Sequence, residues 1–219
     1  MTTYAEIRKN EAIQTYIRQA DQSLAALGFT EHSFAHVTRV ADTAQEILRT
    51  LSHDAHEIEL AGIAGYLHDI GNLVNRVDHS QSGAVMAFRI LDRLNLPAAD
   101  IARIVTAIGN HDEGTGVPVD DLSAALILAD KSDVRRSRVR NRDITSFDIH
   151  DRVNYSVQSS SLNIDDAHTT ITLSLDIDTQ YGSIMDYFEI FLGRMLLCRK
   201  AAEKLGLLFR LTINGQALI

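Results

Sequence analysis

Apolar side chains recur every three or four residues through the first two thirds of the chain, which is the spacing of one buried helix face. The stripe formed by Val37, Val40, Ala44 and Leu48 is an example. The pattern predicts helices over residues 4–27, 33–51, 56–68, 80–94, 98–109 and 119–136. Three glycines and a proline within residues 109–118 interrupt it and predict a loop.

The pattern changes after about residue 143. Residues 169–177 alternate strictly between polar and apolar side chains, which is the period of a β-strand with one buried face. Residues 182–205 have the spacing of a long amphipathic helix. Residues 207–213 predict a second strand, and Asn214-Gly215 predicts a turn after it.

These elements predict a mainly α-helical protein with two parts. Residues 1–142 form a helical core of the bundle type, and residues 143–219 form a small C-terminal α+β appendage. Two strands make a marginal sheet on their own, so the appendage must pack on the core or form a contact in a homodimer. Exposed strand edges favour the dimer, and the sequence leaves both arrangements open.

The composition is that of a globular protein, since 45% of the 219 residues are hydrophobic and 23% are charged. The net charge of −8 argues against binding to nucleic acid backbones. No apolar run approaches the ~20 residues that span a bilayer, and the first residues lack the apolar segment of a signal peptide. We therefore expect a cytoplasmic protein without a membrane partner. The single cysteine, Cys198, excludes an internal disulfide framework and predicts a buried helical thiol.

One tetrapeptide, His68-Asp69-Ile70-Gly71, places an imidazole and a carboxylate at the end of an apolar run over residues 60–67. Burial of both groups is unfavourable unless a partner compensates them, and a metal ion is such a partner. His36 on a second predicted helix and Asp130 at the end of a third apolar run offer further ligands. Helical bundles build metal sites in their cores from side chains that converge in this way.

Two imidazoles and two carboxylates suit a divalent ion such as Mn, Fe, Co, Ni, Zn or Mg. From about residue 30 to 140, their order resembles the HD-domain superfamily of metal-dependent phosphohydrolases, and the HDIG tetrapeptide is literal. The resemblance implies that His36, His68, Asp69 and Asp130 bind a first ion. It also implies an all-helical fold and hydrolysis of a phosphoester or phosphoanhydride, with Asp69 in the catalytic centre.

Two further histidines, His79 and His111, lie at the start of one predicted helix and just after another. HD proteins with two ions carry extra histidines in these intervals, and Asp69 would then bridge the ions. The arrangement is most similar to the dinucleoside-tetraphosphatase branch. Resemblance to cyclic-di-GMP phosphodiesterases of the HD-GYP type is weak, because Asp112 stands where they have a second histidine and the GYP triplet does not occur. Since His79 would also serve as a helix cap, one or two ions per chain remain open.

Six cations occupy the twelve residues from Lys131 to Arg142 in an otherwise acidic chain. Arginine suits phosphate because its planar fork contacts two oxygens. We expect Lys131, Arg135 and Arg138 to contact substrate phosphate, the first two from the helical turn that starts at Asp130. The remaining cations are expected to face solvent.

Two acidic residues beside His111 are candidate catalytic groups. Asp112 or Glu113 would act as a general base or orient a neighbouring group. Asn72 follows the HDIG glycine, where many such proteins carry lysine, and its presence removes one phosphate-binding cation.

Two of the histidines outside the six candidate metal ligands remain to be interpreted. His32 lines the entrance of the site or is incidental. A second His-Asp pair, His150-Asp151, has no apolar helix before it and is interpreted as coincidental. No chemistry is recognised in the C-terminal part.

The leading hypothesis is a metal-dependent phosphohydrolase that uses metal-activated water on a nucleotide or another small phosphorylated compound. A dinucleoside-tetraphosphatase-like enzyme with two ions is one alternative. A non-catalytic regulatory module that binds metal and nucleotide is another, favoured by Asn72 and by the unassigned C-terminal part. A structural helical domain with incidental histidines is a third, and it would purify without stoichiometric metal.

Overall fold

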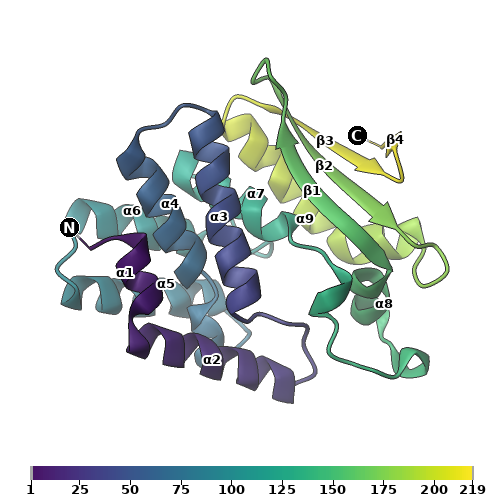
Figure 1. Cartoon of the computed structure of the whole chain (residues 1–219), viewed down its shortest axis with the longest axis horizontal. Coiled ribbons are helices and arrows are strands. Elements are labelled where there is room, and N and C mark those ends of the chain that lie inside the picture. Colours follow the sequence, from purple (N-terminus) through teal and green to yellow (C-terminus); the bar gives the residue numbers. More distant parts are fainter. Residues whose placement is uncertain (1, 219) are drawn as a thin grey trace.

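A computed structural model describes residues 2–218; Met1 and Ile219, the outermost residues of the two predicted parts, lie outside it. Most of the chain is helical, and a small sheet with one long helix covers one side (Figure 1). The N-terminal helices are α1 (Tyr4–Lys9), α2 (Glu11–Ala26), α3 (Phe34–Thr50), α4 (Ala55–Leu67), α5 (His79–Arg93), α6 (Ala98–Gly109) and α7 (Asp121–Ser132). The predicted fold class, a helical core with a C-terminal α+β part, is confirmed.

Two of the predicted helices differ from the structure in extent. Residues 4–27 form two helices, because Asn10 ends α1 and its side chain accepts hydrogen bonds from the first backbone amides of α2. The predicted helix over 119–136 ends at Ser132, because Asp133 leaves the helical conformation and turns its carboxylate toward His36. Lys131 and Arg135 therefore do not share a helical turn, contrary to the prediction.

Close contact between α3 and α4 positions the two histidines that these helices carry. α4 is buried on all sides from Leu60 to Leu67, which explains its continuous apolar run. Gly65 lies so near α3 that a Cβ atom there would be 2.6 Å from the Cα atom of Ala41. The absence of a side chain at this position lets the two backbones touch, and His36 and His68 face one another across the contact.

The C-terminal part contains more strands than the sequence predicts. Its elements are α8 (Ile149–Ser156), β1 (Val157–Ile164), β2 (Thr170–Ile177), α9 (Ile184–Lys204), β3 (Leu208–Ile213) and β4 (Gln216–Ala217). β1 pairs antiparallel with β2, β2 pairs parallel with β3 through the α9 crossover, and β4 adds to β3. β1 escaped prediction because it is an edge strand, rich in serine and half exposed, so backbone pairing rather than apolar alternation defines it.

The described residues also include the 3₁₀ turns η1 (Ile70–Leu73), η2 (Arg136–Arg138) and η3 (Ile144–Ser146). α9 packs along α7, so apolar side chains from both predicted parts form one continuous core. Cys198 on α9 belongs to this core, which confirms the predicted buried thiol. Within residues 2–218, no helix is long and apolar enough to cross a bilayer.

Candidate metal centre and adjoining cavity

Four side chains from three helices meet in the interior of the helical part. The Nε2 atoms of His36 and His68 lie 3.5 and 3.3 Å from Oδ2 of Asp69. The same two nitrogen atoms lie 3.4 and 3.7 Å from Oδ1 of Asp130. The first predicted ligand set therefore converges on one point, although its members are up to 94 residues apart in the sequence.

Hydrogen bonds at the far ring nitrogens orient both imidazoles. Nδ1 of His36 donates to Oδ2 of Asp133 at 2.8 Å, and Nδ1 of His68 donates to the carbonyl oxygen of Gly65 at 2.8 Å. Protonation at Nδ1 leaves a lone pair on each Nε2 atom, and neither buried Nε2 atom has a hydrogen-bond partner among the described residues. Such orphaned lone pairs beside carboxylates fit a metal ion, and this second layer of acceptors is typical of metal-binding histidines.

His79 and His111 form a second set on the other side of Asp69. Their Nδ1 atoms donate to the carbonyl oxygens of Arg76 and Ile108, at 3.1 and 2.6 Å. Their Nε2 atoms lie 3.2 Å apart, and Nε2 of His79 lies 3.4 Å from Oδ1 of Asp69. The two oxygens of Asp69 therefore face different histidine sets. His79 occupies the first residue of α5, but its ring points inward instead of capping the helix.

The electrostatics of the site favour a bound cation. Burial opposes protonation of His68, but the carboxylates of Asp69 and Asp130 outweigh burial and raise its pKa to about 10. Burial of His111, reinforced by the charges of His68 and Lys131, lowers its pKa to about 3. The two carboxylates thus favour positive charge at Nε2 of His68, whereas burial keeps His111 neutral, with the lone pair of its Nε2 atom available. A divalent ion satisfies both, because it replaces the proton and accepts the lone pair.

A chain of ion pairs leads outward from Asp130. Lys131 lies 2.8 Å from Asp130 and 2.6 Å from Glu113, and Arg194 on α9 lies 3.0 Å from the other oxygen of Glu113. Burial by itself would raise the pKa of Glu113, but the charges of Lys131 and Arg194 hold it far below its usual range. This geometry favours a positioning role for Glu113 over proton abstraction. Oδ1 of Asp112 lies 4.0 Å from Nε2 of His79. No Lys or Arg among the described residues forms an ion pair with Asp112.

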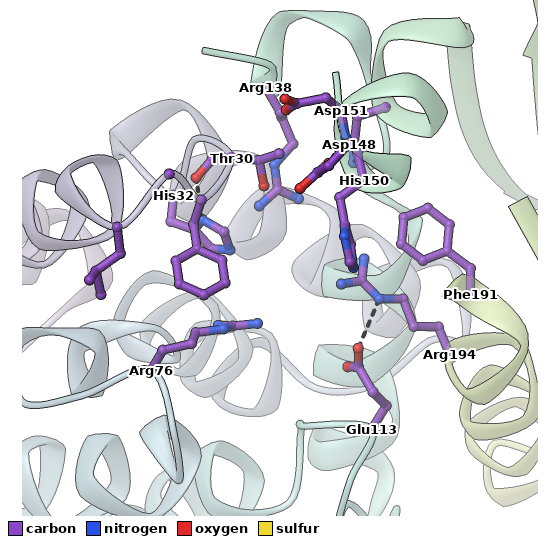
Figure 2. Close-up of a pocket in the computed structure, with 14 residues that line it drawn as sticks. Thr30, His32, Arg76, Glu113, Arg138, Asp148, His150, Asp151, Phe191 and Arg194 are labelled. Carbon is purple, nitrogen blue, oxygen red and sulfur yellow. Dashed lines mark hydrogen bonds and ion pairs between the residues drawn. The ribbon is translucent and has the colours of Figure 1, made fainter. Parts of the chain in front are cut away.

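A cavity of about 440 Å³ opens beside these groups, between the helical part and the C-terminal part (Figure 2). Its polar lining includes His32, Arg76, Glu113, Arg138, His150 and Arg194. Two lining residues contact the candidate metal ligands. The ring of His32 packs edge-on against His36, and Nη1 of Arg76 lies 3.4 Å from Nε2 of His79. The cavity therefore shares its inner wall with the candidate metal centre.

The predicted phosphate-binding residues occupy three different environments. Arg138 lines the cavity, whereas Lys131 lies beneath it in the ion-pair chain. Arg135 is not part of the cavity lining and instead pairs with Asp133 and Glu31.

Arg76, His150 and Arg194 are among the cavity residues that sequence reasoning missed. His150 was interpreted as coincidental because no apolar helix precedes it, but η3 and α8 fold back to place it over the cavity (Figure 2). The only signal for Arg194 is a cation within the apolar centre of a long helix. The C-terminal part thus contributes polar groups to the cavity, contrary to the expectation that it carries no chemistry.

Comparison with known proteins agrees with this architecture. The family model of the HD domain matches residues 33–152, more than half of the chain. The chain therefore belongs to the HD-domain family, as its motifs predicted.

Two individual proteins are similar to this chain. An uncharacterized protein of Methanocaldococcus jannaschii is 24% identical over 160 residues, which cover 63% of this chain and 61% of that protein. The matched region thus spans less than two thirds of the archaeal protein. A predicted HD superfamily hydrolase from an uncultured Thermotogales bacterium, known from its crystal structure, is 28% identical with a TM-score of 0.45. That match covers 57% of this chain and 67% of the bacterial one.

Proposed function

We propose that this protein is a metal-dependent phosphohydrolase that cleaves a phosphoester or phosphoanhydride bond of a nucleotide or another small phosphorylated compound. One observation carries the proposal: Asp69 faces two sets of oriented histidine lone pairs at the wall of a cavity lined with arginine. Carboxylate and imidazole ligands suit divalent ions that activate water, and guanidinium groups suit phosphate.

The two histidine sets support two ions, with Asp69 shared between them. His36, His68 and Asp130 offer ligand atoms within 4.8 Å of one another, and so do His68, Asp69 and His111, so His68 lies within reach of both groups. His79 joins the second set through Nε2 contacts of 3.2 Å to His111 and 3.4 Å to Asp69. The face-to-face Nε2 atoms of His79 and His111 repel one another unless a proton or a metal ion lies between them. Divalent ions bound there would polarise a phosphoryl oxygen and lower the pKa of a water molecule toward neutrality.

The protein's own residues supply the remaining functions. Asp112 is the proposed proton acceptor, because it is partly exposed at the edge of the second set and no Lys or Arg among the described residues pairs with it. Glu113 keeps Lys131 and Arg194 in place through two ion pairs. The C-terminal helix α9 closes one wall of the cavity with Phe191 and reduces the access of bulk water to the reacting group.

Metal analysis combined with a phosphate-release screen tests this function. The purified protein is analysed for Mn, Fe, Co, Ni, Zn and Mg, and phosphorylated compounds are then screened with the ion that is found. Asp69→Asn keeps the shape of the side chain but removes the charge, so we expect it to fold, to lose bound metal and to lose hydrolysis. Asp166→Asn in the exposed β1–β2 turn is the matched control. Full hydrolysis by Asp69→Asn, or absence of metal from the native protein, would overturn the proposal.

A further inference from the structure

Three guanidinium groups from distant parts of the chain point into the cavity (Figure 2). Arg76 comes from the segment between η1 and α5, Arg138 from η2 and Arg194 from α9. Their side chains enter from three sides, and each has N–H groups without a hydrogen-bond acceptor among residues 2–218. Unsatisfied guanidinium donors around one cavity are the chemistry of an oxyanion site.

Arg76 is held by the residue that replaces the usual lysine after the HDIG motif. Nη1 of Arg76 donates to Oδ1 of Asn72 at 3.3 Å, and Nδ2 of the buried Asn72 donates to Oδ1 of Asp69 at 2.9 Å. The guanidinium also lies over the ring of Phe29, at 5.9 Å from its centroid. Asn72 therefore connects the candidate metal centre to Arg76. Position 72 lacks the usual lysine, but Arg76 supplies a cation to the cavity in its place.

Arg194 is the second well-placed donor. Its Nε atom donates to Glu113 at 3.0 Å, and its guanidinium lies 4.3 Å from the centroid of Phe191. These contacts fix the plane of the group and leave both terminal nitrogens directed into the cavity (Figure 2). Arg138 is more constrained, because its Nε and Nη1 atoms donate to the carbonyl oxygens of Glu31 and Asp133 and only Nη2 remains.

The carboxylates of the lining are either occupied or lie on α8. Glu113 is shared between Lys131 and Arg194. Asp148 accepts a hydrogen bond from the first turn of α8, and Asp151 accepts one from Asn141. Arg76 and Arg194 thus border the metal centre, where Glu113 is already paired with two cations, whereas Asp148 and Asp151 lie at the start of α8.

We propose that Arg76 and Arg194, assisted by Arg138, form the binding cradle for a phosphomonoester or terminal phosphate. A three-sided cradle matches the three non-bridging oxygens of such a group, whereas a phosphodiester offers only two. This inference rests on the proposed function and adds its substrate class. It also assigns Arg194 in the C-terminal part, together with Arg76, the role predicted for Lys131 and Arg135.

Isothermal titration calorimetry with inorganic phosphate tests the cradle in the metal-loaded protein. We expect Arg76→Gln and Arg194→Gln each to weaken phosphate binding about tenfold or more, since hydrogen bonds to charged groups are among the stronger ones. Arg194→Lys keeps the charge but loses the fork and should remain weakened. The control is Arg199→Gln, which removes a half-exposed cation from the same helix. Dimethyl phosphate should bind the native protein at least tenfold more weakly than phosphate.

The outcomes separate the cradle from the proposed function. If phosphate binding is lost in variants that retain the metal content of the native protein while no phosphorylated compound is hydrolysed, the cradle is correct and the proposed hydrolase is not. If the native protein does not bind phosphate, or if both glutamine variants bind it unchanged with normal metal content and circular dichroism, the cradle is wrong. Arg194→Gln removes an ion pair with Glu113 and could therefore disturb folding. In that case the phosphate affinity of Arg76→Gln decides the test, because the half-buried Arg76 pairs with no carboxylate among the described residues.

Discussion

The Nδ1 atom of His36 donates a hydrogen bond of 2.8 Å to Oδ2 of Asp133, three residues beyond the candidate ligand Asp130. Burial by itself would raise the pKa of Asp133, but the bond from His36 and the charges of Arg138 and Arg135 hold it well below its usual range. Asp133 is therefore an anion that keeps the proton on Nδ1 and aims the Nε2 lone pair of His36 at the metal centre.

This relationship predicts that Asp133→Asn weakens metal binding without removing a ligand. Asparagine can still accept from Nδ1, but without the negative charge His36 becomes a poorer ligand, and we expect affinity to fall about 10–100-fold. Competition with a chromogenic chelator measures the change, and Asp166→Asn is again the control. Affinity equal to that of the native protein would show that Asp133 serves only to end α7.

The second histidine set predicts the number of bound ions. His79→Gln and His111→Gln should each reduce the metal content from two ions per chain to one, because the first set keeps all four of its side chains. Elemental analysis after dialysis measures this stoichiometry. His32→Gln is the matched control, since His32 borders the cavity and its Nδ1 donates to the carbonyl oxygen of Thr30. Equal metal content in all three variants and the native protein would contradict the two-ion arrangement.

The glycine of the HDIG motif has a steric role. A Cβ atom at Gly71 would overlap the carbonyl oxygen of His79 and the backbone nitrogen of Gly83, both in α5. Gly71→Ala should therefore lower the free energy of unfolding by about 3 kcal/mol, at the upper end for overpacking. Urea denaturation measures the change. Gly193→Ala in the middle of α9 meets no atom within 4 Å and should instead raise stability by about 0.5–1 kcal/mol. Similar effects at both positions would refute the steric explanation.

Cys198 predicts a pH dependence in the alkaline range. Burial raises the pKa of its thiol from 9.0 to about 12, so the folded chain keeps a proton that the unfolded chain releases. This contribution to stability is complete below pH 9 and is lost as the pH rises toward 12, by about 1.4 kcal/mol per unit. Urea denaturation at pH 8, 9.5 and 10.5 should show a steeper loss for the native protein than for Cys198→Ala. If the free energy of unfolding of both proteins fell equally with pH, the pKa of the Cys198 thiol would not be raised in the folded protein.

The helical part was largely predictable because its helices are amphipathic or wholly apolar, and apolar spacing records which face is buried. The predicted ends were wrong where a polar side chain decides them, as at Asn10 and Asp133. The edge strand β1 and the short helix α8 were missed, because backbone pairing and a single capping aspartate hold them rather than a run of apolar residues.

The sequence by itself determined the family and named the six candidate metal ligands, because an imidazole or carboxylate that ends an apolar run is costly without a partner. The family resemblance already implied two sets around Asp69, but only the tertiary structure shows that these side chains converge, since distances between side chains on different helices leave no periodic trace in the sequence. The tertiary structure also decided which cations reach the cavity. Arg135 lies in the conspicuous basic run but is turned to Asp133, whereas the isolated Arg76, before α5, and Arg194, on α9, are brought together at one cavity by the tertiary fold.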